Sequence, residues 1–349
     1  MNRYGLVASV ILGSIFLGTP PVPADDWFVG GRAKSDNRDF SLRAAFGQLR
    51  EIQIGVKETT RRLYDVTDSS WKQETAEDYD LNDFGMSGGY NLTGASLEKI
   101  GRYFTFQLDA AFMSPSANPT AQRDYYIEVG DSIEYDGQSY NQMKIPDGSE
   151  FQVEMTGGSV ELHGLITPFT VKPAPAFSIT PWVDLGLFSF IGDYDIDAGE
   201  PQGVVQYQNP PEDFVVGGRS SGFMGLALPE WGGGGEIRFG APGEWNLVLQ
   251  ASATICQFTG STKMLTVNEH REKNVDIDHR NLRLRVLFEV PLNDSIALTA
   301  GVHYQKIESF ASITSSADSP EEVIATRERF DKEVDFRMDS LMGLVGITF

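Results

Sequence analysis

Ten stretches of this chain have the composition of β-strands, and most of them alternate apolar and polar residues with a period of two, the spacing of a strand whose two faces meet different environments. The clearest is 104–113, where Phe104, Phe106, Leu108 and Phe112 interleave with largely polar neighbours. Beyond the amino-terminus, nothing approaches the ~18 consecutive apolar residues of a membrane-spanning helix. The alternation therefore predicts an all-β fold, with strands at 50–63, 81–92, 104–113, 150–166, 177–192, 230–240, 246–258, 281–290, 295–307 and 333–349.

The connections between these stretches alternate between long and short. Long ones begin at Tyr64, Ser114, Asp193, Thr259 and Glu308, and short ones begin at Thr93, Thr167, Ala241 and Pro291. An even number of antiparallel strands with long loops at one end and short turns at the other is typical of a transmembrane up-and-down β-barrel. We expect about ten strands, with eight or twelve as alternatives.

Strand length and aromatic placement favour the same fold. Several stretches exceed the ~9 to 11 residues that cross a bilayer, whereas strands of soluble proteins average ~5 to 6. Aromatic residues gather near strand ends, as in the girdles that such barrels place at the two membrane interfaces: Phe169, Trp182, Trp245 and Phe349 at one end, and Trp231 and Tyr304 at the other.

Two strands change the parity of their apolar residues along their length. In 150–166 the apolar residues are odd-numbered before Gly157-Gly158 and even-numbered after it. In 333–349 they change from even to odd near Asp339-Ser340. A β-bulge inserts one residue and reverses the faces, so the pattern predicts a bulge at each position.

The amino-terminus has the features of a secretory signal peptide. Arg3 precedes the apolar run Leu6 to Gly18, which is too short to span a bilayer as a helix, and Ala24 ends the segment on a small residue. We expect cleavage near Ala24, which gives three parts: a signal peptide at 1–24, a periplasmic lead-in at 25–49 and the barrel at 50–349.

The final stretch places Leu341, Val345, Ile347 and Phe349 on one face, ending on an aromatic residue. It resembles the closing strand of bacterial outer-membrane β-barrel proteins, the small porin-like superfamily. That resemblance implies a Gram-negative outer-membrane location, outer-membrane lipid as a partner, and recognition by the barrel-assembly machinery through Val345, Ile347 and Phe349. It rests on architecture and carries no active site with it.

The net charge limits the range of partners, and the cysteine content limits the disulfides that can form. The formal net charge is −21, and removing residues 1–24 removes Arg3 and no acid, so the mature chain has −22. Such acidity disfavours nucleic acid as a partner and suits cations. The one cysteine, Cys256, has no intramolecular disulfide partner and is expected to be a small buried apolar residue.

If the apolar faces meet lipid, the polar faces line the lumen. Charged groups in a space as narrow as a ten-stranded barrel should pair, and the lumen should be narrow or plugged. A narrow lumen with charged walls predicts a porin-like conduit for ions and small solutes or a structural surface protein. The alternative is an adhesin or receptor that binds through its long Tyr-rich loops. The expected lumen residues are Asp109, Glu161, His163, Asp184, Glu236, Arg238, Arg283, Arg285, Glu289 and His303.

Catalytic and metal signals are weak. The four histidines, His163, His270, His279 and His303, are scattered and give no His-x-x-x-His metal spacing. Asp276, Asp278 and His279 form the one acid–base cluster, but the adjacent Asp-His pair does not match the Asp-x-His pattern of outer-membrane proteases. The acidic run 193–197 lacks the Gly and Glu of a calcium loop. We expect no cofactor, no metal and no enzyme activity, with a surface hydrolase as the less favoured alternative.

Overall fold

The computed structural model describes residues 27–32, 38–65, 70–74, 78–80, 90–114, 116–118, 120–121, 124–208, 211–240, 244–266, 269–316 and 328–349. The predicted signal peptide, the cleavage position near Ala24, and residues 81–89 of the second predicted strand lie outside these ranges. Within them, no helix is long and apolar enough to cross a membrane.

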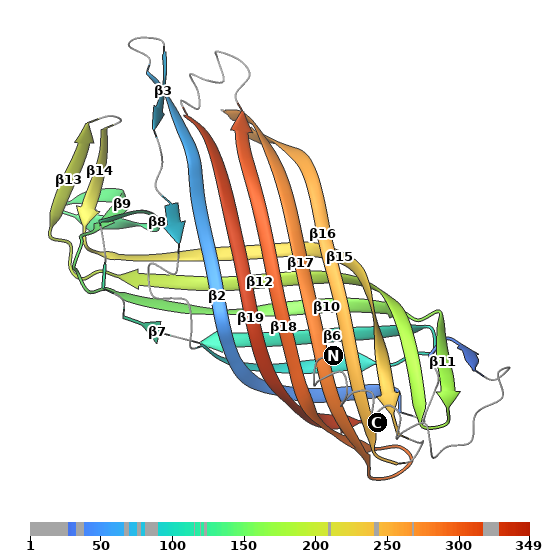
Figure 1. Cartoon of the computed structure of the whole chain (residues 1–349). Helices are drawn as coiled ribbons and strands as arrows, with labels where there is room; N and C mark the ends of the chain where they lie inside the picture. The colour runs from blue at the N-terminus through green and yellow to red at the C-terminus, as the bar shows by residue number, and fades with distance from the viewer. Residues whose placement is uncertain are drawn as a thin grey trace, which may run out of the picture.

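Ten long strands form one closed antiparallel ring (Figure 1). Each strand pairs with the next, and β19 pairs with β2 from Thr348↔Ser41 to Glu328↔Leu63, which closes the ring. The predicted ten-stranded, all-β barrel is confirmed. Its strands are β2 (Phe40–Asp65), β5 (Tyr90–Lys99), β6 (Phe104–Ser114), β10 (Gln152–Ile166), β12 (Phe177–Asp197), β15 (Arg219–Phe239), β16 (Asn246–Thr266), β17 (Glu269–Pro291), β18 (Ala297–Ser316) and β19 (Glu328–Thr348).

Three strand limits differ from the sequence-based expectation. β2 begins at Phe40, so the second part of the predicted lead-in 25–49 is barrel wall. The predicted link that begins at Thr93 belongs to β5. The predicted long connection from Thr259 is a continuous hairpin, whose ladder runs from Asn246↔Glu289 to Thr266↔Glu269. In the segments from Thr93 and Thr259, backbone pairing continues through residues whose side chains show no clear apolar alternation. In the segment from Phe40, Leu42, Ala44 and Phe46 do alternate with inward-facing residues.

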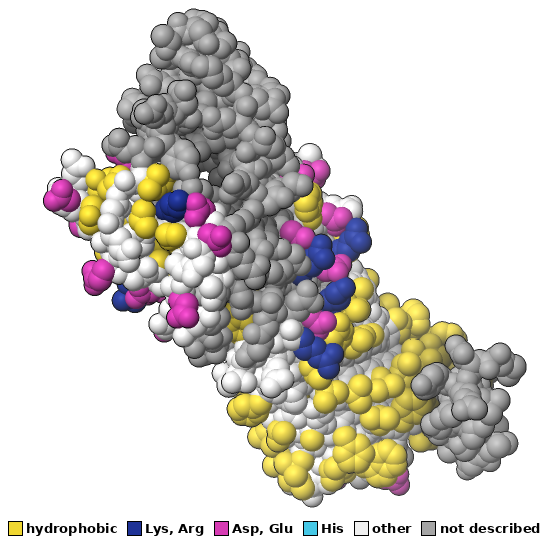
Figure 2. Space-filling view, turned by 60° about the vertical axis from the view of Figure 1, so that its left-hand side comes forward, with side chains coloured by type: hydrophobic (Ala, Val, Ile, Leu, Met, Phe, Trp, Pro, Cys, Tyr) yellow, Lys and Arg dark blue, Asp and Glu magenta, His cyan; other side chains and the backbone are white. Residues whose placement is uncertain are grey.

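A belt of exposed apolar side chains surrounds the part of the barrel nearer the short turns. Figure 2 shows part of it, on one face of the molecule, as a broad group of yellow side chains. A closed ring with an apolar exterior satisfies every backbone group between strands, the condition for crossing hydrocarbon. Leu282, Val286 and Val290 represent the belt on β17, and it includes Leu42, Phe46, Phe104, Phe112, Val160, Leu162, Leu185, Leu187, Ile191, Trp245, Phe288, Leu298, Val302, Val345, Ile347 and Phe349 elsewhere.

Above the belt the arrangement is reversed, with apolar side chains inside and polar ones outside. On β19, Phe336 and Met338 are buried while Arg337 is exposed; lower on the same strand, Val345 and Ile347 are exposed. The upper core consists of Leu49, Ile52, Tyr90, Leu92, Met113, Val153, Met155, Phe188, Phe190, Phe336, Met338 and Met342. The barrel thus continues beyond the membrane as an ordinary water-soluble structure.

This reversal, and not a bulge, causes both changes of parity in the sequence. Along β10 the odd-numbered residues face inward on both sides of Gly157-Gly158, and the registers with β6 and β12 run through without a shift. The bulge predicted there is wrong. Near Asp339-Ser340 the β19–β2 register does shift, but Arg50 of β2 is the extra residue, and even-numbered β19 residues face inward on both sides.

The amino-terminal segment closes part of the short-turn end. β11 (Phe169–Ala174) pairs with β12, and β1 (Phe28–Gly30) pairs with β11. Gly31 then turns the chain inward with φ of 75°, and a Cβ there would lie 2.6 Å from the Arg102 carbonyl oxygen. Only glycine fits this turn without strain, and the turn directs Arg32 into the barrel.

Two long connections fold together into a second sheet, called the cap sheet. Its strands are β8 (Tyr125–Tyr135), β9 (Gln138–Ile145), β13 (Gly203–Gln208) and β14 (Pro211–Val216), in the order β13-β14-β9-β8. β14 joins the two connections by pairing parallel to β9. The cap sheet lies at the long-loop ends of β10, β12 and β15 (Figure 1), and its buried residues Ile133, Met143 and Val215 belong to the same apolar cluster as the upper core.

Short strands complete the fold: β3 (Ser70–Glu74) and β4 (Asp78–Asp80) pair with β2, and β7 (Ser116–Ala117) pairs with β10.

Candidate functional site: the barrel interior

The structure places all ten residues expected at the lumen on the inner face of the ring. They alternate with belt residues along β6, β10, β12, β15, β17 and β18, because successive side chains of a strand point to opposite faces. Nine are buried, and Arg238, the tenth, has a side chain 16% exposed. They divide into a middle tier at belt level and a lower tier near the short turns.

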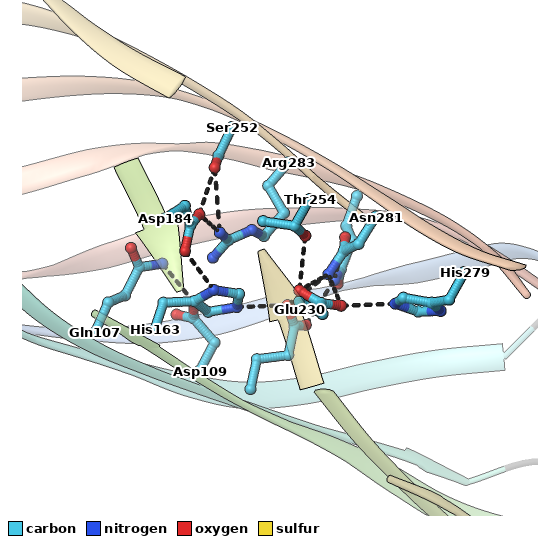
Figure 3. A network of polar contacts seen from close by, with 12 residues as sticks. Gln107, Asp109, His163, Asp184, Glu230, Ser252, Thr254, His279, Asn281 and Arg283 are labelled. Atoms are coloured by element: carbon cyan, nitrogen blue, oxygen red, sulfur yellow. Dashed lines mark hydrogen bonds and ion pairs between the residues drawn. The ribbon is translucent and has the colours of Figure 1, made fainter. Parts of the chain in front are cut away.

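The centre of the middle tier is His163, held between two carboxylates (Figure 3). Its Nδ1 lies 2.9 Å from Asp184 Oδ1, and its Nε2 lies 3.4 Å from Glu161 Oε2. Asp184 also accepts hydrogen bonds from Ser252 and from the Arg283 guanidinium. Charges this deeply buried remain stable only when paired and hydrogen-bonded, so the arrangement fixes four strands relative to one another.

A second pair crosses the interior beside it. Arg285 donates to Asp109 Oδ2 at 2.5 Å, and the Gln107 amide donates to the same oxygen at 2.6 Å. His303, also expected at the lumen, is 2% exposed, and its Nε2 has no hydrogen-bond partner in the described part of the chain. The structure therefore brings His303 beside this pair without giving it a comparable role.

The upper end of the network consists of residues that were not predicted at the lumen. Glu230 is fully surrounded: His279 Nε2 approaches at 2.7 Å, the Thr254 hydroxyl donates at 2.7 Å and the Asn281 amide donates at 3.1 Å. Asn281 and Gln305 connect this group to Glu161 at 3.1 and 2.5 Å. Inward parity in the strand ladder is the signal that could have found Asn281 and Gln305, because both continue the inner face of strands already predicted.

The lower tier combines expected and unexpected residues. Arg238 donates to Glu289 at 2.9 Å and to Glu236 at 3.3 Å, and Gln250 donates to Glu236 at 3.0 Å. Arg32, from the amino-terminal segment, forms ion pairs with Glu236 and with Glu98.

Arg43 adds a further pair to the lower tier, since its guanidinium lies 3.3 Å from Glu98 Oε2. Arg32, Arg43 and Glu98 were not predicted at the lumen, because their segments were expected to form a lead-in and a link. With no strand predicted there, an inner face could not be predicted either.

The side chains of the two tiers are almost all buried against one another. Three small cavities lined by described residues lie among them, with volumes of about 10, 10 and 20 Å³, each enough for about one water molecule. They lie against Met113 and Phe190, against Asp109 and Gln305, and against Trp182 and Arg283. Trp182 is 7% exposed and faces inward, so its predicted membership of an outer aromatic girdle is wrong.

Comparison with known proteins assigns no family. No family model matches the chain, and no curated protein matches it. Among solved structures, the outer membrane protease OmpT of Escherichia coli is 8% identical with a TM-score of 0.36, over 90% of this chain and all of that one. A Pseudomonas aeruginosa FadL homologue is 9% identical with a TM-score of 0.22, over 89% and 90% of the two chains.

The β domain of the Bordetella autotransporter BrkA is also similar, at 9% identity and a TM-score of 0.20, over 86% of this chain and 98% of that one. Likeness at this level transfers neither activity nor partner. The fold described above rests on the chain's own strand pairing and apolar belt.

The acid–base cluster of the sequence analysis separates in the structure. Asp278 faces outward and pairs with Arg280 at 2.9 Å, whereas His279 is fully buried inside and stacks on Phe188 with ring centroids 5.4 Å apart. As neighbours on one strand they point to opposite faces and cannot act as a pair.

His279 instead joins Ser309 and Glu230, each on a different strand. This Ser-His-Glu order is that of a hydrolase triad. Ser309 is itself buried, however, and it lines none of the three cavities described above. The geometry fits a structural hydrogen-bond network.

Proposed function

We propose that this protein is an outer-membrane surface protein whose barrel is a closed, non-conducting anchor for its extracellular half. The filled interior carries the proposal. The apolar upper core, the middle tier and the lower tier occupy the barrel in succession, and the three cavities between described residues each hold about one water molecule. These observations favour an anchor over a porin-like conduit.

The long-loop end supports a display role. The strands continue well beyond the belt; β17 alone has 23 residues, compared with the ~9 to 11 that cross a bilayer. The cap sheet has its own buried residues and therefore a defined shape, unlike the unstructured loops over a simple pore. We assign the binding role of the protein to this cap sheet and to the connections that carry it.

The exposed charges of this region are mostly negative. Glu134, Asp136 and Asp147 are exposed on and beside the β8–β9 hairpin, and Glu200 and Asp213 on the other connection. Lys144 is largely covered and pairs with Asp124 at 2.6 Å. A surface of this sign attracts cationic partners and repels nucleic acid, which extends the expectation from net charge to a particular surface.

Planar-bilayer recording of the refolded protein tests the closed barrel. We expect a silent bilayer under voltages at which a trimeric porin, inserted in the same way, shows discrete steps. Insertion is verified separately by protease protection of the belt strands. Discrete conductance steps from the unmodified protein would overturn the anchor proposal and restore the conduit.

A cap-sheet deletion tests the display role. Replacing residues 203–216 by a short Gly-Ser linker removes β13 and β14 while leaving every barrel strand intact. Cells that express this variant should lose attachment to a positively charged surface while the barrel keeps its heat-dependent gel mobility. Unchanged attachment at equal expression would contradict the assignment.

A further inference from the structure

One wall of the barrel carries basic side chains directly above the apolar belt. The upper edge of the belt lies at Leu282 on β17, Tyr304 on β18, Leu341 on β19 and Phe46 on β2. Outward-facing Arg280, Lys306, Arg337 and Arg50 occupy the first or second outward position above these residues. We call these four residues the basic rim.

The basic rim is compact and accessible. Its residues lie on four consecutive strands of the ring, so they span about 15 Å at the usual strand spacing. The side chains of Arg280, Lys306 and Arg337 are 64%, 46% and 52% exposed. Charged and apolar side chains meet at this level in Figure 2, immediately above the group of yellow side chains.

The opposite wall is the more acidic of the two at the same level, because on the rim wall the four bases are interspersed with the outward-facing acids Asp278, Glu308, Asp335 and Asp339. Outward positions above the belt on the opposite wall carry Glu154 on β10 and Asp193, Asp195 and Asp197 on β12. Arg219 faces them and forms an ion pair with Asp195. In a chain with a net charge of −21, exposed bases above the belt on the described strands are thus concentrated on one wall.

The rim bases already have acidic neighbours, but these bonds are exchangeable. Arg280 pairs with Asp278 at 2.9 Å, Lys306 with Glu308 at 2.6 Å and Arg337 with Asp335 at 2.7 Å, each two residues away on the same strand. Solvent-exposed pairs of this kind contribute little to stability. A phosphate group offers more acceptor oxygens than a carboxylate and binds guanidinium groups in a bidentate manner.

We propose that the basic rim binds phosphorylated lipid head groups of the surrounding outer leaflet. A lipid whose chains lie against Leu282, Val302 and Leu341 places its head group where the rim side chains end, because long basic side chains extend toward the interface. The inference rests on the proposed membrane insertion, and it gives the barrel a preferred side toward anionic lipid.

Native mass spectrometry of the refolded full-length mature chain tests the inference. The probe is a bis-phosphorylated glucosamine lipid, mixed as a minor component with phosphatidylcholine, and the readout is the lipid that remains bound after detergent transfer. The unmodified protein should retain the phosphorylated lipid in preference to phosphatidylcholine. The triple variant Arg280→Gln, Lys306→Gln, Arg337→Gln should lose roughly tenfold or more of that preference, because each base near an anionic surface contributes appreciably to binding.

Matched variants separate charge from folding. Arg219→Gln removes a base from the acidic wall and should leave retention unchanged. Asp278→Asn with Asp335→Asn frees two rim bases and should raise retention. Arg280→Lys keeps the charge and should retain most of the phosphorylated lipid that the unmodified protein retains.

Equal retention by the unmodified protein and the triple variant would overturn the inference, as would a loss in the Asp variants equal to that in the triple variant. Insertion into pure phosphatidylcholine vesicles is measured in parallel. A protein that inserts normally but shows no lipid preference refutes the basic rim alone, whereas a protein that fails to insert refutes the membrane anchor as well.

Discussion

Replacing Asp184 by Asn should be among the most destabilising single changes in the barrel. The Asp184 carboxylate is fully buried and receives His163 at 2.9 Å together with Ser252 and Arg283. The amide leaves the Arg283 guanidinium, 5% exposed, without its counter-charge. Breaking one side of a buried ion pair costs about 3 to 5 kcal/mol, a large part of the ~5 to 15 kcal/mol that stabilises a typical fold.

Urea unfolding in lipid vesicles, followed by tryptophan fluorescence and by gel mobility without heating, measures this loss. The double variant Asp184→Leu, Arg283→Met removes both charges and should recover most of the lost stability, since apolar replacement of a buried pair is often neutral. The exposed pair of Arg219 and Asp195 supplies the control, and Asp195→Asn should unfold with the unmodified protein. Equal midpoints for Asp184→Asn and Asp195→Asn would refute the reasoning.

Four further outcomes follow from the same structure. Gly186→Ala should destabilise the barrel, because its Cβ would lie 2.4 Å from His163 Nδ1 and displace the ring from Asp184; an unchanged urea midpoint would contradict this. Arg32→Ala leaves the Glu98 and Glu236 carboxylates without this partner and should lower the free energy of unfolding by about 3 kcal/mol. The variant should still show no conductance in a planar bilayer, because the tiers above remain filled. Conductance in this variant would identify the amino-terminal segment as a gate. Phe349→Ala removes the ring that stacks on Phe40 with centroids 6.0 Å apart, and it should slow assembly, measured as the folded fraction over time. The control is Leu298→Ala, at a residue that is equally exposed, and it should slow assembly less. Cys256, 5% exposed, should resist maleimide in the folded barrel and react in urea, and labelling of the folded protein would contradict its inward position.

A period of two in the apolar residues predicts that strands exist, but it does not show which face of each strand points into the barrel. The alternation along β10 and β19 was sufficient to predict both strands and the ring they join. It could not show that apolar residues such as Met155 and Met338 point inward while Val160 and Val345 point outward. Outside the barrel the chain meets water above the belt and lipid at the belt, so the same alternation buries apolar residues in the first region and exposes them to lipid in the second. A change of parity in such a strand marks the membrane boundary.

Partners across the interior are beyond any local pattern. Asp109 and Arg285 are 176 positions apart in the chain, and Arg32 and Glu236 are 204 apart. The sequence places both members of the first pair on inner faces, but only closure of the ring and the stagger of its strands bring them within bonding distance. The upper half of the β16–β17 hairpin escaped prediction for a related reason: neither of its faces is apolar there, although the backbone ladder continues.

The charged tiers and the apolar upper core together specify strand register. A slip of one residue along β17 would turn Arg283, Arg285 and Glu289 toward lipid and Leu284 and Val286 inward. Each Arg so exposed near the membrane midplane costs ~2 to 4 kcal/mol. The same slip on β19 would expose Phe336 and Met338 to water above the belt. A barrel that was apolar inside and outside at every level would lack this penalty, so the buried charges act in register selection even where their net contribution to stability is small. The double variant Asp184→Leu, Arg283→Met separates the two roles: it should keep the urea midpoint of the unmodified protein while refolding into a mixture of species, and a single sharp folded band would show that register is specified elsewhere.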